Sequence, residues 1–426
     1  MSDLKNNLAW QKIFNKHKII NEIETKGQFI ISSSDINEFR EARLMTKFDY
    51  KSQLPQIFVD NNFSVLPISR GNYIISNFET FKNFEDNDVE ITKMNFPSYL
   101  ESIDYNNITS ESIALNCAYV SGIIEEFTGD EELVLTISGR MSSSLFNFNI
   151  DSKNGLLEIK VENAQIEIDG GYEGYNSLNL IEAKNSISKD FLIRQIYYPY
   201  KLWEKNITKN VRPIFLTYTN GIFHFREYSF KDPGHYNSLE LIREKKYMIR
   251  EGAINTELII KVLNETSIIE EPEIAFPQAN SFDRVINICE ILNENDTLNK
   301  EEITSRYDFD ERQTNYYTDA GRYLGLIEKK NENTKIIYFL TNKGKKLFQL
   351  SIIDRQLEFV KIILSHLAFN KTLKLYFDKA DIPESMEVIN IMKSSNLYKI
   401  ESETTFFRRS STILSWINWI LELIEE

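Results

Sequence analysis

The chain is poor in the residues from which several common kinds of site are built. Only two of its 426 residues are cysteines, Cys117 and Cys289. Two thiols cannot supply a disulfide framework or a cysteine-rich zinc or iron–sulfur site, so we expect buried free thiols in a reducing cytosol. The four histidines are scattered without the spacing of metal ligands. No Walker-type glycine loop is present, which argues against an ATP-driven motor.

Long apolar runs are also missing. No run of about 18 apolar residues is available to span a membrane, and the start of the chain does not resemble a signal peptide. We therefore expect a cytoplasmic protein. Positive charge is in the minority, and the formal net charge of −14 argues against indiscriminate binding to nucleic acid, which depends on neutralising phosphates. A local basic groove is still compatible with this charge.

Three polar residues on two neighbouring apolar segments carry the strongest functional signal. Residues 156–169 and 178–184 have the composition of strands, and a glycine-rich turn separates them. The first segment ends in Asp169, and the second ends in Glu182-Ala-Lys184. Side chains alternate along a strand with period 2, so Glu182 and Lys184 point to the same face. If the two strands pair, carboxylates from both meet on one face.

Two carboxylates beside a lysine have a chemical use. Mg²⁺ prefers oxygen ligands, usually one or two carboxylates completed by water and substrate phosphate. A lysine can orient the attacking water or stabilise the charge on phosphorus. Glu167, on the same strand face as Asp169, and Glu125, at the end of a helix predicted for residues 111–126, are possible additional acids. The ordinary alternative is a surface strand on which Lys184 pairs with the neighbouring acids.

The surrounding segments predict a mixed α/β fold. Gly170-Gly171 is expected to end the first strand, and Ser188 is expected to cap a helix that begins at Lys189. A buried strand over 213–218 follows, and Asn220-Gly221 is a strong signal for a hairpin. The expected fold is a mixed sheet flanked by helices.

This order and the D…ExK pattern resemble the PD-(D/E)xK nuclease superfamily, and within it the type II restriction endonucleases, over about residues 111–230. The resemblance implies that Asp169 and Glu182 ligate Mg²⁺, that Lys184 assists the attacking water, and that all three are catalytic. It further implies cleavage of a specific double-stranded DNA sequence with 5′-phosphate ends, and a cognate DNA methyltransferase as a separate protein. Gln195 lacks the tyrosine that accompanies it in the exonuclease branch, so we assign it no role.

The sequence beyond this core divides into further regions. With 42% hydrophobic residues and this length, the chain can form several domains with large cores. The leading part looks like the first domain of a group of bacterial restriction endonucleases, and arginines and lysines at 40, 43, 47 and 70 either touch DNA or form a solvated face. We expect an N-terminal α+β domain over 1–100, a nuclease core over 105–268, a winged-helix domain over 280–350 and a C-terminal helical region over 351–426.

The winged-helix prediction rests on element order. After a proline-punctuated linker at 270–280, three predicted helices precede two predicted strands, and Asp308 or Asp310 caps the third helix. That helix and the following turn carry residue types that reach base edges or phosphates, namely Arg312, Gln313, Asn315, Arg322, Lys343 and Lys345. The alternative is a winged helix that binds protein.

Three more arginines are candidates for DNA contact. Arg140 lies in a segment that reads as a polar loop, where it can hold a phosphate. Arg408 and Arg409 belong to an R-R-x-x-T-x-x-x-W pattern that looks like the closing helix of several restriction endonucleases.

Only one D…ExK constellation is found, so cutting both strands predicts a homodimer. The apolar faces of 357–368 and 416–424 are its candidate contacts. Two other functions stay open: a repair or phage-defence nuclease without sequence preference, and a winged-helix transcription regulator without catalysis.

Overall fold

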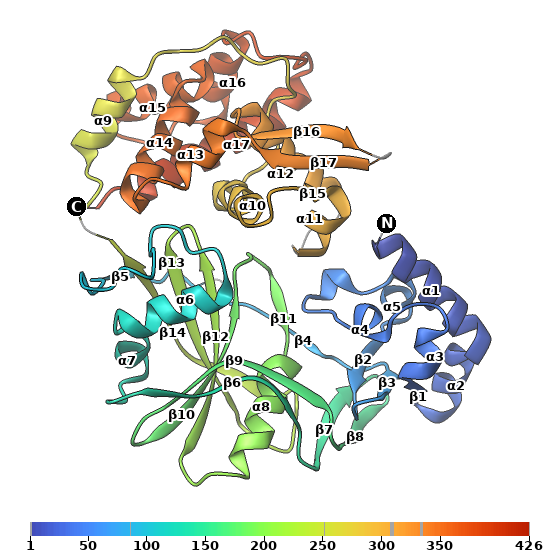
Figure 1. The fold of residues 1–426 in the computed structure, drawn as a ribbon. Helices are drawn as coiled ribbons and strands as arrows, with labels where there is room; N and C mark the ends of the chain where they lie inside the picture. The colour runs from blue at the N-terminus through green and yellow to red at the C-terminus, as the bar shows by residue number, and fades with distance from the viewer. Residues whose placement is uncertain (1, 86, 251, 307–310, 333–334, 426) are drawn as a thin grey trace.

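The computed structural model of the chain describes residues 2–85, 87–250, 252–306, 311–332 and 335–425. It shows a mixed α/β protein with a multistranded mixed sheet flanked by helices, as the sequence predicts. In Figure 1 an N-terminal unit, drawn in blue, lies beside the central sheet, and a largely helical C-terminal region lies above it. None of the helices in the described residues combines the length and hydrophobicity needed to cross a membrane.

The central sheet has seven strands in the order β5-β14-β13-β12-β10-β9-β6. The β10–β12 and β14–β5 pairs are parallel and the others are antiparallel. The strands are β5 (Ile91–Met94), β6 (Val134–Ser142), β9 (Gln165–Glu173), β10 (Ser177–Lys184), β12 (Asn210–Thr219), β13 (Ile222–Phe230) and β14 (Leu239–Ile249). The predicted hairpin at Asn220-Gly221 joins β12 to β13, and both turn residues have positive φ, as a type I′ turn requires.

Helices cover both faces of this sheet. On one face, α6 (Glu111–Val120) and α7 (Ile123–Thr128) pack against Ile181 and Ala183 of β10. On the other face, α8 (Arg194–Glu204) packs against Leu178 and Leu180. Almost every residue of β10 is buried, as expected for a central strand with both faces covered. The alternation places Glu182 on the α8 side.

Two helix predictions near the site need correction. The helix expected over 111–126 is two helices, because Gly122 adopts a left-handed conformation with φ of 75° between them. The helix expected to begin at Lys189 begins at Arg194 instead. The residues expected to form the first turn of this helix form strand β11 (Asp190–Leu192) instead. β11 pairs with β4 (Phe81–Asn83), which lies far away in sequence.

The N-terminal unit packs helices on a small antiparallel sheet in the order β1-β3-β2. Its elements are α1 (Ser2–His17), α2 (Ile19–Lys26), β1 (Phe29–Ser32), α3 (Ser33–Asn37), α4 (Ala42–Met45), η1 (Lys51–Gln53), α5 (Gln56–Asn61), β2 (Ser64–Pro67) and β3 (Asn72–Ser76). Trp10, Phe14 and Phe58 lie at the centre of its core. A separate hairpin, β7 (Phe146–Ser152) and β8 (Gly155–Val161), packs between this unit and α8.

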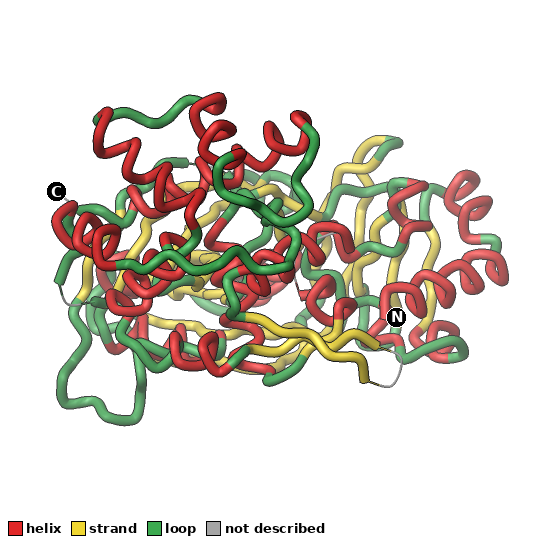
Figure 2. Tube along the Cα trace, turned by 90° about the horizontal axis from the view of Figure 1, so that it is seen from above, coloured by secondary structure: helices red, strands yellow, loops and turns green. Residues whose placement is uncertain are grey.

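The C-terminal region contains the three helices and two strands expected between residues 281 and 341, and a short β15 adds a third strand. Its elements are α9 (Thr256–Glu265), α10 (Phe282–Asn295), β15 (Leu298–Asn299), α11 (Lys300–Arg306), α12 (Glu311–Tyr323), β16 (Ile327–Glu332), β17 (Lys335–Leu340), α13 (Asn342–Leu347), α14 (Ile352–Leu364), α15 (Leu367–Lys379), α16 (Ser385–Lys393) and α17 (Glu403–Glu422). The predicted cap residues Asp308 and Asp310 lie outside the described residues. Figures 1 and 2 show the β16–β17 hairpin extending toward the side of the N-terminal unit.

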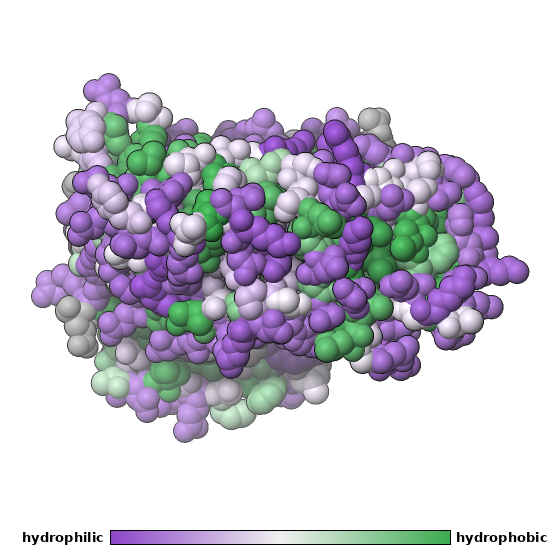
Figure 3. Space-filling model, turned by 90° about the horizontal axis from the view of Figure 1, so that it is seen from below, coloured by the Kyte–Doolittle hydropathy of each residue, from purple (hydrophilic) through white to green (hydrophobic). Residues whose placement is uncertain are grey.

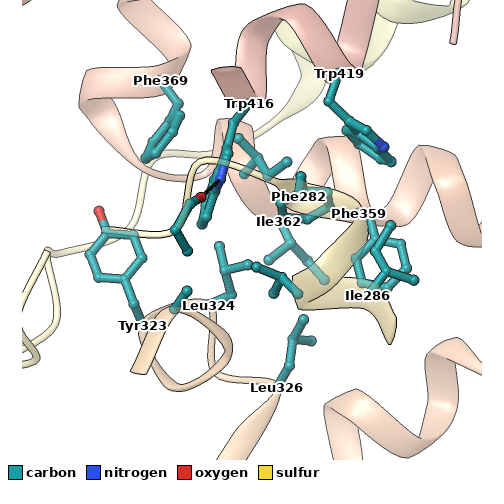
Figure 4. Packing of buried hydrophobic residues seen from close by; sticks show 14 of the residues in the cluster. Phe282, Ile286, Tyr323, Leu324, Leu326, Phe359, Ile362, Phe369, Trp416 and Trp419 are labelled. Carbon is teal, nitrogen blue, oxygen red and sulfur yellow. Dashed lines mark hydrogen bonds between the residues drawn. The ribbon is translucent and has the colours of Figure 1, made fainter. Parts of the chain in front are cut away.

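The two segments predicted as dimer contacts are internal. In Figure 4, Trp416 lies between Phe369 and Phe282, with ring centroids 5.1 and 4.9 Å away, and its indole N–H donates to the carbonyl of Ala279 at 2.7 Å. Phe359 of α14 is also fully buried. The apolar faces of 357–368 and 416–424 therefore fill the core of their own chain. The face of the molecule seen in Figure 3 is mostly hydrophilic, with hydrophobic residues in small separate groups.

Candidate active site

The candidate site lies where β9 and β10 separate. Their ladder ends at the pair formed by Ile181 and Gly170. Asp169, the next residue along β9, uses its side chain instead: Oδ2 accepts a hydrogen bond from the main-chain N–H of Ala183 at 2.8 Å. The carboxylate of Asp169 is thereby fixed beside the Glu182-Ala183-Lys184 segment, and the two acids predicted from the sequence are brought together.

A β-bulge aims Asp169 into this position. Ile137 and Gly139 of β6 pair with Gly171 and Ile168 of β9, so two steps on β6 (139 − 137) face three on β9 (171 − 168). The extra residue falls at Asp169-Gly170, and a bulge of this kind turns a side chain away from the regular alternation.

The two glycines do not end the strand, which continues to Glu173, and the expectation that they would was wrong. Glycine is needed at these two positions because neighbouring side chains leave no space for a Cβ atom. A Cβ on Gly170 would lie 2.8 Å from the ring of Tyr172, and a Cβ on Gly171 would lie 2.8 Å from Cβ of Ile137. Close approach of neighbouring side chains, and not a turn, therefore requires glycine at both positions.

Glu182 and Lys184 form the centre of the site. Glu182 is only 8% exposed. Its Oε1 accepts from Lys184 Nζ at 2.5 Å and from Gln195 Nε2, on α8, at 2.7 Å. Lys184 Nζ also donates to the carbonyl of Ala183 at 3.1 Å. Gln195, for which the sequence indicated no role, is therefore a direct partner of Glu182.

A further acid comes from α6, at the opposite end from the one expected. Glu111 Oε1 lies 3.9 Å from Lys184 Nζ. Glu125, the residue predicted for this role, is exposed on α7. Its neighbour Glu126 pairs with Lys245 of β14. Strands are about 4.8 Å apart, so β14 lies about 14 Å from β10 across β13 and β12. The sequence does contain a signal for the start of this helix: Ser110 is the N-cap of α6 and places Glu111 in its first turn.

The charges of these groups influence one another strongly. Burial raises the pKa of Glu182 to about 8, with the carboxylates of Asp169 and Asp49 adding to the effect and Lys184 opposing it. Burial alone lowers the pKa of Lys184, but the surrounding carboxylates raise it well above its usual value, and Glu182 contributes most. Burial also raises the pKa of Glu111. Several strongly shifted pKa values within one cluster of charged side chains are typical of functional sites.

The donor set suits a hard dication. The carboxylates of Asp169 and Glu182 and the carbonyl of Ala183 are oxygen ligands of the type that Mg²⁺ prefers. The ammonium of Lys184 already donates to Glu182 Oε1 and to the Ala183 carbonyl, so these oxygens jointly hold a positive charge. Among the described residues, no group of three or more His, Cys, Asp or Glu side chains is arranged to hold a metal ion. Two carboxylates completed by water and phosphate are nevertheless the usual Mg²⁺ arrangement.

Glu167 and Arg140 lie at the margin of the site. Glu167 helps to line a small cavity together with Glu182, Gln195 and Pro199. Its carboxylate also accepts from Arg140 Nε at 3.2 Å, and both side chains are more than half exposed. Arg140 lies on strand β6, not in the loop that was expected, because residues 134–142 find a partner in β9.

The candidate DNA-contacting residues of α12 and α13 differ in their exposure and in their contacts within the chain. Arg312 is exposed and stacks on Tyr316, whose hydroxyl accepts from its Nε at 2.5 Å. Arg322 pairs with Asp319 at 2.7 Å. Lys343 donates to the carbonyl of Leu324 at 3.2 Å. Lys345 is exposed, and Gln313 and Asn315 are half-buried.

Residues of the R-R-x-x-T-x-x-x-W pattern of α17 form hydrogen bonds to the linker at residues 270–280. Arg409 donates to Gln278 Oε1 at 2.7 Å, and Thr412 donates to Asn280 Oδ1 at 2.9 Å. Together with Trp416, which binds Ala279, these residues hold three consecutive linker residues. Of the two predicted arginines, Arg409 is therefore engaged within the chain, whereas Arg408 is exposed.

Three stretches of the chain match family models, each described as a domain of unknown function: DUF6996 over residues 7–75, DUF6997 over 76–248 and DUF7226 over 284–425. No curated protein and no solved structure matches the chain significantly. The stretch similar to DUF6997 contains Glu111, Asp169, Glu182, Lys184 and Gln195. The candidate site is thus contained almost entirely in one matched domain whose function is unknown.

Proposed function

We propose that the protein is a Mg²⁺-dependent DNA endonuclease of the type II restriction class, with a PD-(D/E)xK core and a winged-helix domain in the C-terminal region. One observation carries the proposal. Asp169 and Glu182, from two strands that separate at a bulge, converge beside Lys184 at the end of a mixed sheet. A solvated strand face does not explain this arrangement, because Glu182 is buried and the side chain of Lys184 is only 13% exposed.

In this proposal each residue has one role. Asp169 and Glu182 hold the cation, which when bound lowers the pKa of a water and neutralises charge on the phosphodiester. With a cation bound, the ammonium of Lys184, which donates to Glu182 and to the carbonyl of Ala183, would orient the attacking water or stabilise the charge on phosphorus. Glu111, 3.9 Å from Lys184, keeps the lysine protonated and near the site.

DNA recognition is assigned to the C-terminal region. Arg312 and its neighbours on α12 have donors that suit base edges, and the lysines of α13 and of the β16–β17 hairpin suit phosphates. Because one chain holds one such site, cutting both strands of a duplex requires two copies, and we propose a homodimer that assembles on a palindromic target. A separate cognate methyltransferase would protect the host DNA.

The test is a cleavage assay with catalytic variants. Plasmid and phage DNA are incubated with the full-length protein and Mg²⁺, and the products are separated on a gel. Discrete bands support the restriction class, and a smear points to a nuclease without sequence preference. Intact DNA overturns the proposal and favours a winged-helix regulator.

The variants Asp169→Asn, Glu182→Gln and Lys184→Ala are each expected to lower cleavage by more than about a hundredfold, since even partners of metal ligands are worth roughly 10–100-fold. Lys26→Ala, which removes an exposed ion pair with Glu22 on α2, is the control and is expected to keep the catalytic rate. Full cleavage by Glu182→Gln would contradict the assignment.

A further inference from the structure

A segment of the N-terminal unit reaches the candidate active site. Residues 48–53, which we term the clasp segment, connect α4 to α5 and lie against β11. The carbonyl of Asp49 accepts from the N–H of Leu192 at 3.0 Å, and the N–H of Lys51 donates to Asp190 Oδ1 at 2.9 Å. The main chain of the clasp segment is therefore held to the core on both sides of Tyr50.

Asp49 is connected to Glu182 through a single side chain. Gln195 Nε2 donates to Glu182 Oε1 at 2.7 Å and to Asp49 Oδ1 at 3.3 Å. Because one amide nitrogen serves both carboxylates, the position of Asp49 limits how Gln195 can turn. Asp49 is itself constrained, since its N–H donates to Gln53 Oε1 at 2.6 Å and its side chain is only 21% exposed.

The other end of the Gln195 amide points to a role in the site. Its Oε1 is buried and has no hydrogen-bond partner among the described residues. Gln195 lines the small cavity that also contains Glu167 and Glu182. A buried acceptor without a partner is costly, so a water in this cavity is the natural donor. An amide held in this way can orient both the carboxylate of Glu182 and a water beside it.

The clasp segment does not need the carboxylate of Asp49 to hold the N-terminal unit to the core. Tyr50 already binds Ser186, with 2.6 Å between the hydroxyl oxygens, and Lys51 binds Asp190. Asp49 instead adds negative charge to a site that already contains Asp169 and Glu182, where it raises the pKa of Glu182 and is offset by the ammonium groups of Lys184 and, at 3.9 Å, Lys47. Its place beside the acids is therefore better explained by the site than by domain contact.

We propose that Asp49 is a positioning residue of the nuclease site, which fixes Gln195 so that Glu182 presents its carboxylate to the cation. This inference rests on the proposed function. It makes the N-terminal unit part of the active site. Gln53 Nε2 also donates to the carbonyl of Ser305 in α11 at 2.5 Å, so the clasp segment contacts all three regions of the chain.

The test is a titration of the full-length protein with Mn²⁺, followed by calorimetry without DNA. Asp49→Ala is expected to weaken Mn²⁺ binding roughly 10–100-fold, the usual effect of losing a partner of a metal ligand. Asp49→Asn keeps an oxygen that accepts from Gln195 and is expected to stay within a few-fold of the wild type. Asp190→Ala loosens the same segment without touching Gln195, and it is expected to leave the Mn²⁺ affinity unchanged.

A double-variant cycle separates positioning from general damage. If Asp49 acts through Gln195, the double variant of Asp49→Ala and Gln195→Ala loses no more affinity than Gln195→Ala alone. Additive losses, an unchanged affinity in Asp49→Ala, or an equal loss in Asp190→Ala would each overturn this inference while the nuclease proposal stands. A wild-type protein that binds no Mn²⁺ and cuts no DNA would overturn both.

Discussion

The side chain of Asn287 in α10 binds the main chain around Ile187, three residues after Lys184. Its Oδ1 accepts from the N–H of Ile187 at 3.2 Å, and its Nδ2 donates to the carbonyl of Asn185 at 3.0 Å. Asn287 is fully buried. The loop that leaves the candidate site is therefore held by the C-terminal region. A substitution in α10 is expected to change the position of Lys184.

Asn287→Ala is expected to destabilise the protein and to lower cleavage. It removes two hydrogen bonds to the half-buried main chain of Asn185 and Ile187, each worth about 0.5–1.5 kcal/mol. The free energy of unfolding in urea and the cleavage rate at saturating DNA measure the two effects. Asn293→Ala is the control, because Asn293 lies on the same helix and binds Asn107, away from the loop. Equal losses in the two variants would show that the loop has no special importance.

The sequence predicted the strands that carry the site, but it did not predict the residues that other parts of the chain contribute to the site. The strands that carry Asp169 and Glu182 are present because their apolar and strand-forming residues are local signals, but the segment expected as one strand over 156–169 divides into β8 and β9, which pair in different sheets. Glu111 and Asp49 were missed as site residues because both reach the site through tertiary packing. Helical periodicity predicts a face of a helix but not which of its ends lies over a given strand.

Other expectations failed for the same physical reason. Residues 190–192 form a strand because β4, more than a hundred positions earlier, offers main-chain partners. Arg409, which stays a candidate for DNA contact, already donates from Nη1 to the linker residue Gln278. Such pairings are decided by which segments meet in the folded chain, and composition does not report them.

Cation binding should depend steeply on pH. The pKa of Glu182 is raised from 4.5 to about 8, so between these values the metal-free protein carries a proton that a cation must displace. Mn²⁺ affinity is expected to rise by about tenfold per pH unit up to about pH 8, and then to level off. Calorimetry at a series of pH values measures this, and a flat profile would contradict the assignment of Glu182 as a ligand.

The same shift has a consequence for stability. A group whose pKa is raised on folding stabilises the protein below its unfolded value, and this contribution is lost as the pH rises through the folded value. Without a cation, the protein should therefore lose stability between about pH 4.5 and about pH 8 on account of Glu182. Glu182→Gln cannot titrate and is expected to show a flatter dependence of its melting temperature on pH over this range.

Gly170→Ala should damage both the fold and the site. The new Cβ would lie 2.8 Å from the ring of Tyr172, which is buried and packs against the ring of Tyr119. Overpacking of this kind typically costs about 1–3 kcal/mol, and it would shift the bulge that aims Asp169. Thermal unfolding and Mn²⁺ binding report the two effects. Gly71→Ala serves as the control, since its Cβ would meet only Ser33 Oγ, at 3.5 Å.

Two substitutions should separate base recognition from phosphate binding. Arg312→Ala is expected to cost roughly 1–3 kcal/mol of binding to the target sequence and little on other duplexes, because a bidentate contact to a base is specific. Lys345→Ala is expected to weaken binding to every duplex and to reduce the salt dependence by about one phosphate contact. Lys261→Ala, an exposed lysine of α9, is the control. Fluorescence anisotropy with Ca²⁺ in place of Mg²⁺ measures binding without cutting. If affinity and salt slope are unchanged in both variants, α12 and α13 do not bind DNA, and this part of the C-terminal region is better assigned to a protein partner.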